Sequence, residues 1–212
     1  MIETNFTQTS FYRKATMKYV SDNNQILVIL DLDETLIHAT ETPGYGEWHF
    51  ELDKYKIYIR PGLSKFLEKL KESFRVAVWS SASDDYVKQV VEKIFPLDYP
   101  LEFVWGRSRC TLKHDQSILE QYGYSNCYSH QHYVKPLVKV KKKGIARLEK
   151  ILIIDDTPAK SRLNYGNAIY PLQFNGDPND NELIRLIEYL KTLKLVENVR
   201  EIEKRNWREN NN

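Results

Sequence analysis

Three short runs of apolar residues most limit how this chain can fold. They are ILVIL at 26–30, FRVAV at 74–78 and ILII at 151–154. Each reads as a continuous apolar segment rather than an alternating one, which is typical of strands covered on both faces in a parallel sheet. Between and after them, apolar residues recur at helical spacing over 63–70, 83–94 and 183–193. This order of strands and helices predicts an open, Rossmann-like α/β fold with a parallel sheet.

Two further segments predict a small β-hairpin inserted after the first strand. Residues 48–52 and 55–59 are rich in aromatic and β-branched side chains and are separated by Asp53-Lys54. Between Ile37 and Ile59 there is no room for a large cap domain. We therefore expect any site at the edge of the sheet to be open enough to admit a peptide.

The length and composition are those of an ordinary soluble domain. The 212 residues are 42% hydrophobic and 28% charged, so we expect one domain over 25–195, with a polar N-terminal extension at 1–24 and a polar C-terminal tail at 196–212. Only Cys110 and Cys127 are present, which indicates a reduced, cytoplasmic or nuclear protein. No apolar run approaches the roughly 20 residues of a membrane helix, and residues 1–14 lack the apolar segment of a signal peptide. A monomer without membrane contact is expected.

Polar residues cluster where the predicted strands end. Because the carboxyl ends of parallel strands meet at one edge of a sheet, these side chains should form one site. Clustered carboxylates repel one another unless a cation lies among them, and Mg²⁺ prefers oxygen ligands. Together with a hydroxyl and an ammonium group that can hold an oxyanion, they predict phosphoryl transfer through an aspartyl-phosphate. The residues concerned are Asp31, Asp33, Ser80, Lys135, Asp155 and Asp156.

Simpler interpretations exist for several of these residues. An isolated pair of aspartates after a strand often caps a helix, but acids at the ends of two separate strands favour a functional role. Ser80 is preferred to Ser81 and Ser83 by position alone, since any of the three could cap the next helix. The basic segment 139–143 lacks interleaved aromatic residues, so we expect a solvated turn and no direct nucleic-acid binding. The five histidines show no metal-ligand spacing and are expected to be surface or packing residues.

Several motifs together resemble those of the haloacid dehalogenase superfamily. Within it, the chain is similar to the small protein phosphatases that act on the C-terminal domain of RNA polymerase II and on related phosphoserine or phosphothreonine substrates. The motifs that carry the resemblance are DLDETL at 31–36, IRPGLSKFLEKL at 59–70, VWSSAS at 78–83, YVKPL at 133–137 and ILIIDDTPAK at 151–160. The resemblance implies a Mg²⁺-dependent hydrolase without a large cap domain.

The resemblance also implies a role for each matching residue. Asp31 would attack phosphorus, while Asp33 would protonate the leaving alkoxide and then activate water. Thr35 would orient Asp33 beside the substrate, and Ser80 would bind a phosphoryl oxygen. Lys135 would neutralise the phosphate and the aspartyl-phosphate. The implied metal ligands are Asp31, the backbone carbonyl of Asp33, Asp155, and Asp156 through the water shell of the ion.

Substrate recognition is where the chain departs from the family pattern. The interval 110–128 and the lysine-rich segment near residue 140 are longer than in small relatives. An arginine of WGRSRC is expected to reach substrate, and Arg107 fits better than Arg109. In relatives the hairpin borders an apolar pocket, although its side chains here could simply close a small core.

Two other functions compete with a protein phosphatase. One is a small-molecule phosphatase of the same superfamily. The other is a non-catalytic peptide-binding module resembling the mitochondrial import receptor domain, which the presence of Asp31, Asp33, Lys135 and Asp155 disfavours.

Overall fold

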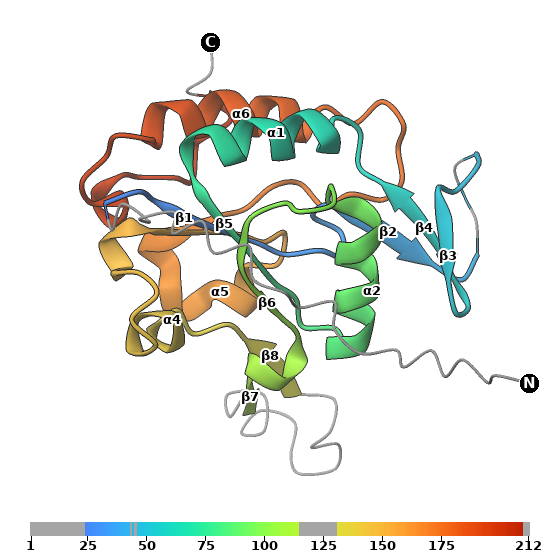
Figure 1. The fold of residues 1–212 in the computed structure, drawn as a ribbon, viewed down its shortest axis with the longest axis horizontal. Coiled ribbons are helices and arrows are strands. Elements are labelled where there is room, and N and C mark those ends of the chain that lie inside the picture. The colour runs from blue at the N-terminus through green and yellow to red at the C-terminus, as the bar shows by residue number, and fades with distance from the viewer. Residues whose placement is uncertain (1–23, 43, 45, 115–130, 210–212) are drawn as a thin grey trace, which may run out of the picture.

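A five-stranded parallel sheet lies at the centre of the molecule, as the apolar runs predict (Figure 1). The computed structural model describes residues 24–42, 44, 46–114 and 131–209. The strands lie in the order β10-β9-β1-β5-β6, and every neighbouring pair is parallel. Their bounds are Leu27–Leu30 for β1, Arg75–Trp79 for β5, Leu101–Trp105 for β6, Ile151–Ile154 for β9 and Ala168–Ile169 for β10.

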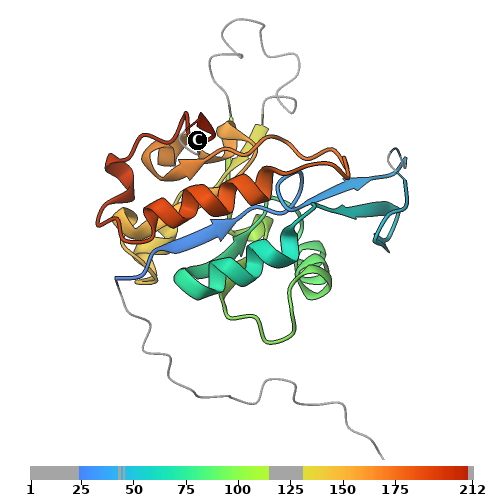
Figure 2. The same ribbon diagram turned by 90° about the horizontal axis from the view of Figure 1, so that it is seen from above.

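Helices cover both faces of this sheet, which is why its strands are apolar throughout. Figures 1 and 2 show α1 (Leu63–Ser73) and α6 (Glu182–Leu193) side by side on one face. Val28 and Leu30 belong to the core on that face, together with residues of α2 (Asp84–Ile94). Leu27 and Ile29 belong to a second core with residues of α4 (Val138–Lys142). The described residues also form four 3-10 turns and one short helix: η1 Arg107–Arg109, η3 Leu148–Lys150, α5 Pro158–Ser161, η4 Arg162–Asn167 and η5 Val199–Glu201.

The starts of the long helices follow local sequence signals. The Ser83 hydroxyl accepts a hydrogen bond from the Tyr86 amide at the first turn of α2, as an N-cap should. At α6, the Asp180 carboxylate accepts the Glu182 amide at 2.9 Å. Not every apolar residue of this helix is buried, because Ile184 is 46% exposed.

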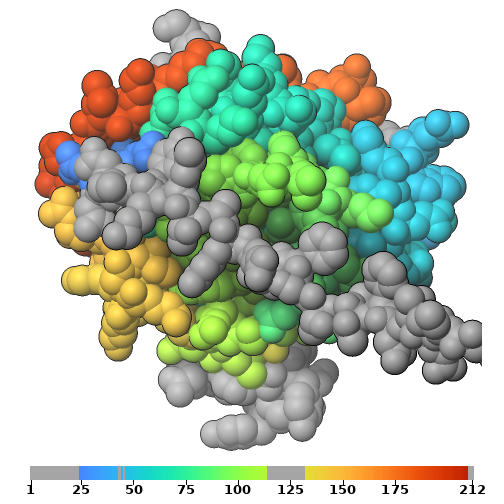
Figure 3. Space-filling view, viewed as in Figure 1, coloured from blue at the N-terminus to red at the C-terminus, as the bar shows by residue number. Residues whose placement is uncertain are grey.

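The predicted hairpin consists of β3 (Phe50–Leu52) and β4 (Tyr55–Ile59), joined at Asp53, whose φ is 50°. A strand that was not predicted, β2 (Ile37–Thr40), pairs with β4 and extends the hairpin to three antiparallel strands. The Ile57 side chain is fully buried in the main core. The hairpin therefore helps to close the core, which is one of the two roles considered for it above. The hairpin forms one side of the molecule in Figure 3.

A second antiparallel pair, β7 (Thr111–His114) and β8 (Gln131–Val134), lies beyond β6. The interval that separates these two strands, residues 115–130, lies outside the described part of the chain, and so does Cys127. Most of the expected N-terminal extension, residues 1–23, also lies outside it. Within the described residues, no helix is long and apolar enough to cross a bilayer.

The C-terminal segment packs onto the domain as far as Arg208, past the boundary expected at residue 195. Trp207 is 1% exposed and lies against Tyr189, with ring centroids 5.8 Å apart. Its indole N–H donates to the Tyr170 carbonyl, and Arg208 donates to Glu182 at 2.8 Å. The segment is largely polar in composition. A single buried tryptophan forms no periodic pattern, so the packing of the segment could not be predicted from the sequence.

Candidate active site

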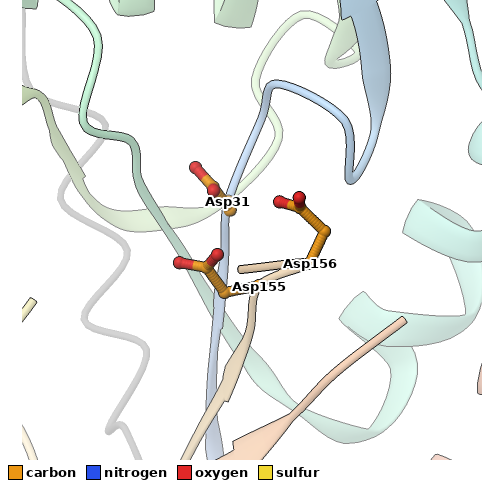
Figure 4. A group of neighbouring side chains, drawn as sticks. All are labelled: Asp31, Asp155 and Asp156. Carbon is orange, nitrogen blue, oxygen red and sulfur yellow. The ribbon is translucent and has the colours of Figure 1, made fainter. Parts of the chain in front are cut away.

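Strands β1 and β9 bring the first two aspartates together. Leu30 pairs with Ile154 in the parallel register, so the residues that follow, Asp31 and Asp155, are neighbours at the carboxyl edge of the sheet. The Asp31 amide donates to the Ile154 carbonyl at 2.9 Å and fixes this arrangement. Asp156 is the next residue along, and Figure 4 shows the three side chains gathered where β1 and β9 end.

Two lysines neutralise Asp31 from different directions. The Lys135 Nζ lies 2.9 Å from Asp31 Oδ1 and 2.7 Å from Asp155 Oδ2. The Lys160 Nζ lies 3.0 Å from Asp31 Oδ2. Burial alone would raise the pKa of Asp31, but the two ammonium groups lower it below its ordinary value. Asp31 is therefore held as a carboxylate, the form that can act as a nucleophile.

Three other charged groups around Asp31 have raised pKa values, whereas the pKa of Asp31 is lowered. Burial and the charge of Asp31 raise the pKa of Asp155 to about 6. Burial would lower the pKa of Lys135, yet Asp155 and Asp31 raise it. Burial likewise opposes the charged form of Lys160, whose pKa is raised by Asp31 and Asp155. Both lysines thus remain cations around the carboxylates.

Asp33 lies in a different environment two residues after Asp31. The Tyr86 hydroxyl donates to its Oδ1 at 2.7 Å, and the Ser80 hydroxyl donates to its Oδ2 at 3.3 Å. Burial and the nearby charge of Asp31 raise the pKa of Asp33. The two aspartates are thus pushed in opposite directions, which suits one for attack and the other for holding a proton.

Thr35 does not contact Asp33 in the way the resemblance implies. Its hydroxyl donates to Asp156 Oδ1 at 3.3 Å and accepts the Asp156 amide at 3.1 Å. The chain turns after β1, where the Leu32 carbonyl accepts the Thr35 amide. This turn brings the Thr35 side chain to Asp156, which follows β9, rather than to Asp33. Thr35 therefore positions Asp156, while Tyr86 and Ser80 orient Asp33.

The donor set of the carboxylate cluster fits Mg²⁺. Oxygen atoms of Asp31, Asp155 and Asp156 all lie within 4.8 Å of one another, and a hard divalent cation takes carboxylate oxygens. The Lys160 ammonium already lies within 4.0 Å of an oxygen of each. A cation is therefore accommodated at this place. The Asp33 carboxylate accepts hydrogen bonds from Tyr86 and Ser80, and its expected metal contact through the backbone carbonyl stays a prediction.

Ser80 and Arg107 lie on the neighbouring strand ends. Trp79 pairs with Trp105, and the Ser80 amide donates to the Trp105 carbonyl at 2.9 Å, which holds the hydroxyl at the site. The Arg107 Nε donates to the Ser81 carbonyl at 2.8 Å, whereas the Arg109 guanidinium lies over the Trp105 ring. Arg107 is thus attached directly beside the Ser80 loop.

The loop that carries Arg107 passes unusually close to α2. A Cβ placed on Gly106 would lie 2.3 Å from Asp84 Oδ1 and 2.8 Å from its Cα, so only glycine fits there. In the basic segment, Lys139 donates to the carbonyls of Arg109 and Cys110. That lysine is thus tied to the same loop.

Glu34 is a neighbour of the site whose side chain faces His38, with Oε1 3.4 Å from Nδ1. Its φ is 58°, and its carbonyl accepts the Phe174 amide at 2.7 Å, which turns the side chain out of the cluster of carboxylates. Burial and the charges of Asp33 and Asp156 raise its pKa to about 7.

Two contact residues of the site escaped the sequence analysis. Tyr86 appeared only as an apolar position of a helix, and Lys160 only as the end of the motif ILIIDDTPAK. Neither spacing nor composition distinguishes a lysine that reaches back across 129 positions to Asp31 from one that faces solvent.

Comparison with known proteins places this site in a family. The family model for NLI interacting factor-like phosphatases matches residues 26–200. The chain belongs to this family. The match spans the sheet from β1 onward and includes every strand end that contributes to the site.

Individual relatives are distant and mostly longer. The CTD small phosphatase-like protein 2 of Dictyostelium discoideum is 26% identical over 83% of this chain and 29% of its own length. Nuclear envelope morphology protein 1 of Saccharomyces cerevisiae is 27% identical over 82% of this chain and 40% of its own length. The chain thus spans well under half of these two relatives.

A solved structure shares the fold of this family member. The structure of the fission yeast RNA polymerase II CTD phosphatase Fcp1-R271A bound to beryllium fluoride aligns with a TM-score of 0.57 and 17% identity. The alignment covers 81% of this chain and 63% of that one. The predicted α/β architecture with a parallel sheet is confirmed.

Proposed function

We propose that this protein is a Mg²⁺-dependent phosphatase that hydrolyses phosphoserine or phosphothreonine in proteins through an aspartyl-phosphate. The observation that carries the proposal is that Asp31 and Asp33, at the end of the same strand, have their pKa values shifted in opposite directions, that of Asp31 down and that of Asp33 up. A carboxylate with a lowered pKa beside a carboxyl with a raised pKa suits nucleophilic displacement of an alkoxide, because the first favours attack and the second favours proton transfer.

In the first half of the reaction, an Asp31 oxygen attacks phosphorus and the bond to the serine or threonine oxygen breaks. Asp33 gives its proton to that leaving oxygen, because an alkoxide is a poor leaving group unless it is protonated. The hydrogen bond from the Tyr86 hydroxyl holds the Asp33 carboxyl in a fixed orientation for this step.

In the second half, water hydrolyses the aspartyl-phosphate. Asp33, now ionised, takes a proton from the attacking water, and the bond between phosphorus and the Asp31 oxygen breaks. Lys135 neutralises negative charge on the phosphoryl group throughout, from a position fixed by Asp155. The Ser80 hydroxyl and Arg107 bind phosphoryl or substrate oxygens at the rim.

Asp31, Asp155 and the backbone carbonyl of Asp33 would hold Mg²⁺ directly, and Asp156, positioned by Thr35, would hold it through water. The ion, when bound, offsets the charge that the phosphate and the clustered carboxylates bring together. Thr35 thereby supports the metal site rather than the proton-transfer group.

A phosphoprotein substrate is favoured by the small size of the insertion between Ile37 and Ile59. Between Ile37 and Ile59 the described chain forms only the small sheet β2-β4-β3, and Tyr55 of that sheet faces Tyr86 with ring centroids 6.5 Å apart. An open edge with an aromatic wall admits an extended peptide. We further propose a monomer in the cytoplasm or nucleus, the latter in keeping with relatives named for the nuclear envelope.

The test is hydrolysis of phosphoserine peptides and sugar phosphates by the wild-type protein and by Asp31→Asn with Mg²⁺. Phosphopeptides are expected to be the better substrates, and Asp31→Asn is expected to be inactive. Preference for sugar phosphates would assign a small-molecule phosphatase. Tight peptide binding without Mg²⁺-dependent turnover would assign a binding module.

A further inference from the structure

Lys160 lies among the same three carboxylates that would hold the metal. Its ammonium is 3.0 Å from Asp31 Oδ2, 3.9 Å from Asp155 Oδ1 and 4.0 Å from Asp156 Oδ1. These three residues are the group whose carboxylate oxygens lie close enough together for one ion. One side chain thus provides a positive charge to all three candidate ligands.

The other lysine of the site is held quite differently. Lys135 has a side chain with 0% exposure, pinned between Asp31 and Asp155, and its backbone amide donates to the Lys160 carbonyl. The Lys160 side chain is 21% exposed and starts from α5, a helix of four residues. Lys160 therefore has a path to solvent along the open edge of the site, whereas Lys135 has none.

A divalent ion and the Lys160 ammonium cannot both take up these oxygens. Direct coordination places a metal about 2.0–2.1 Å from carboxylate oxygens, and a second cation retained on the same atoms would be strongly repelled at that separation. When the ion binds, the ammonium must leave the cluster, and its exposed side is the direction in which the substrate phosphate approaches.

We propose that Lys160 is an internal counter-ion that holds the place of Mg²⁺ among Asp31, Asp155 and Asp156 and moves outward when the metal binds. The inference rests on the proposed Mg²⁺ site. In the metal-free protein, Lys160 neutralises the clustered carboxylates. It should therefore stabilise the metal-free protein and weaken Mg²⁺ binding. The displaced ammonium then lies at the phosphate side of the site.

The experiment is a titration of the full chain with MgCl₂ by isothermal calorimetry, for the wild type and Lys160→Met. Methionine keeps much of the length of the lysine but removes its charge. Lys160→Met is expected to bind Mg²⁺ about tenfold more tightly or better, since a competing charge at contact distance is removed. Lys160→Arg, which keeps the charge, is expected to bind no more tightly than the wild type. Lys69→Met, which removes an exposed lysine paired with Glu72, is the matched control and should leave the affinity unchanged.

Thermal unfolding gives a second readout that does not depend on catalysis. In EDTA, Lys160→Met is expected to melt at a lower temperature than the wild type, because the carboxylates lose a counter-charge. Addition of Mg²⁺ should then raise its melting temperature by more than it raises that of the wild type.

Equal or weaker Mg²⁺ affinity of Lys160→Met, with an unchanged thermal response, would overturn the inference. Asp155→Asn separates the two proposals: if it binds Mg²⁺ as well as the wild type, the ion is not at this cluster, and both the metal site and the role of Lys160 fail. If Lys160→Met binds more tightly but no phosphopeptide is hydrolysed by the wild type, the proposed phosphatase activity fails and the role of Lys160 stands.

Discussion

Arg60 connects the turn after β1 to the loop before α6, and breaking this connection should destabilise the fold. Its side chain has 0% exposure. Its Nε and Nη2 donate to Asp180 at 2.9 and 2.8 Å. Its Nη1 donates to the Thr35 carbonyl at 3.0 Å, and Nη2 also donates to the Leu172 carbonyl at 2.8 Å. Removing the partner charge with Asp180→Asn leaves a buried guanidinium without a carboxylate.

The expected loss follows from that burial. Removing one partner of a buried ion pair costs about 3–5 kcal/mol, and we expect about 3 kcal/mol, the lower end, because the Asp180 side chain is 16% exposed. Glu188→Gln is the matched control, since Glu188 pairs with Lys191 at the surface with a 57% exposed side chain. That substitution should cost under about 0.5 kcal/mol. Urea unfolding followed by tryptophan fluorescence measures both.

The pH dependence of the stability gives a further check on the Arg60–Asp180 pair. Burial would raise the pKa of Asp180, but the hydrogen bonds from Arg60 and from the Glu182 amide lower it. A lowered folded-state pKa means that this stabilisation is present above the unfolded pKa, about 3.9, and is lost as the pH falls through the folded value. The difference between wild type and Asp180→Asn should therefore shrink below about pH 4. A difference no larger than that of Glu188→Gln at neutral pH would refute the reasoning.

The remaining predictions concern the site and the C-terminal segment. Asp31→Asn should lower phosphopeptide hydrolysis by at least about 10³-fold, measured as phosphate release, because it removes the nucleophile; near-normal turnover would contradict the mechanism. Because the pKa of Asp33 is raised and its proton goes to the leaving group, kcat should fall as the pH rises past that pKa, and a rate that only rises with pH would exclude this role. Tyr86→Phe removes a hydrogen bond that lowers this pKa, so the alkaline limb of the profile should move to higher pH; an unmoved limb would show that Tyr86 does not act on Asp33. Trp207→Ala should cost about 3–5 kcal/mol in urea unfolding, and a loss under about 1 kcal/mol would show that the segment beyond residue 196 does not stabilise the domain.

Local patterns were sufficient to predict most of the architecture. Continuous apolar runs indicated β1, β5 and β9, helical spacing indicated α1, α2 and α6, and Ser83 marked the start of α2. Each of these patterns lies within a few neighbouring residues, so it can be read from the sequence without knowledge of the fold. The strand β2 was missed because it is four residues long and gains its stability from pairing with β4.

The sequence by itself predicted that Asp31 and Asp155 belong to one site, because the carboxyl ends of parallel strands meet at one edge of a sheet. The pairing of β1 with β9, which makes the two residues neighbours, came from the structure. Only the tertiary structure decided which side chains surround them. Thr35 turned to Asp156 instead of Asp33, Tyr86 reached Asp33 across 53 positions, and Lys160 reached Asp31 across 129. Such contacts depend on how loops from separate strands fold over one edge. A periodic pattern records which face of an element is buried, but not which distant side chain it meets there.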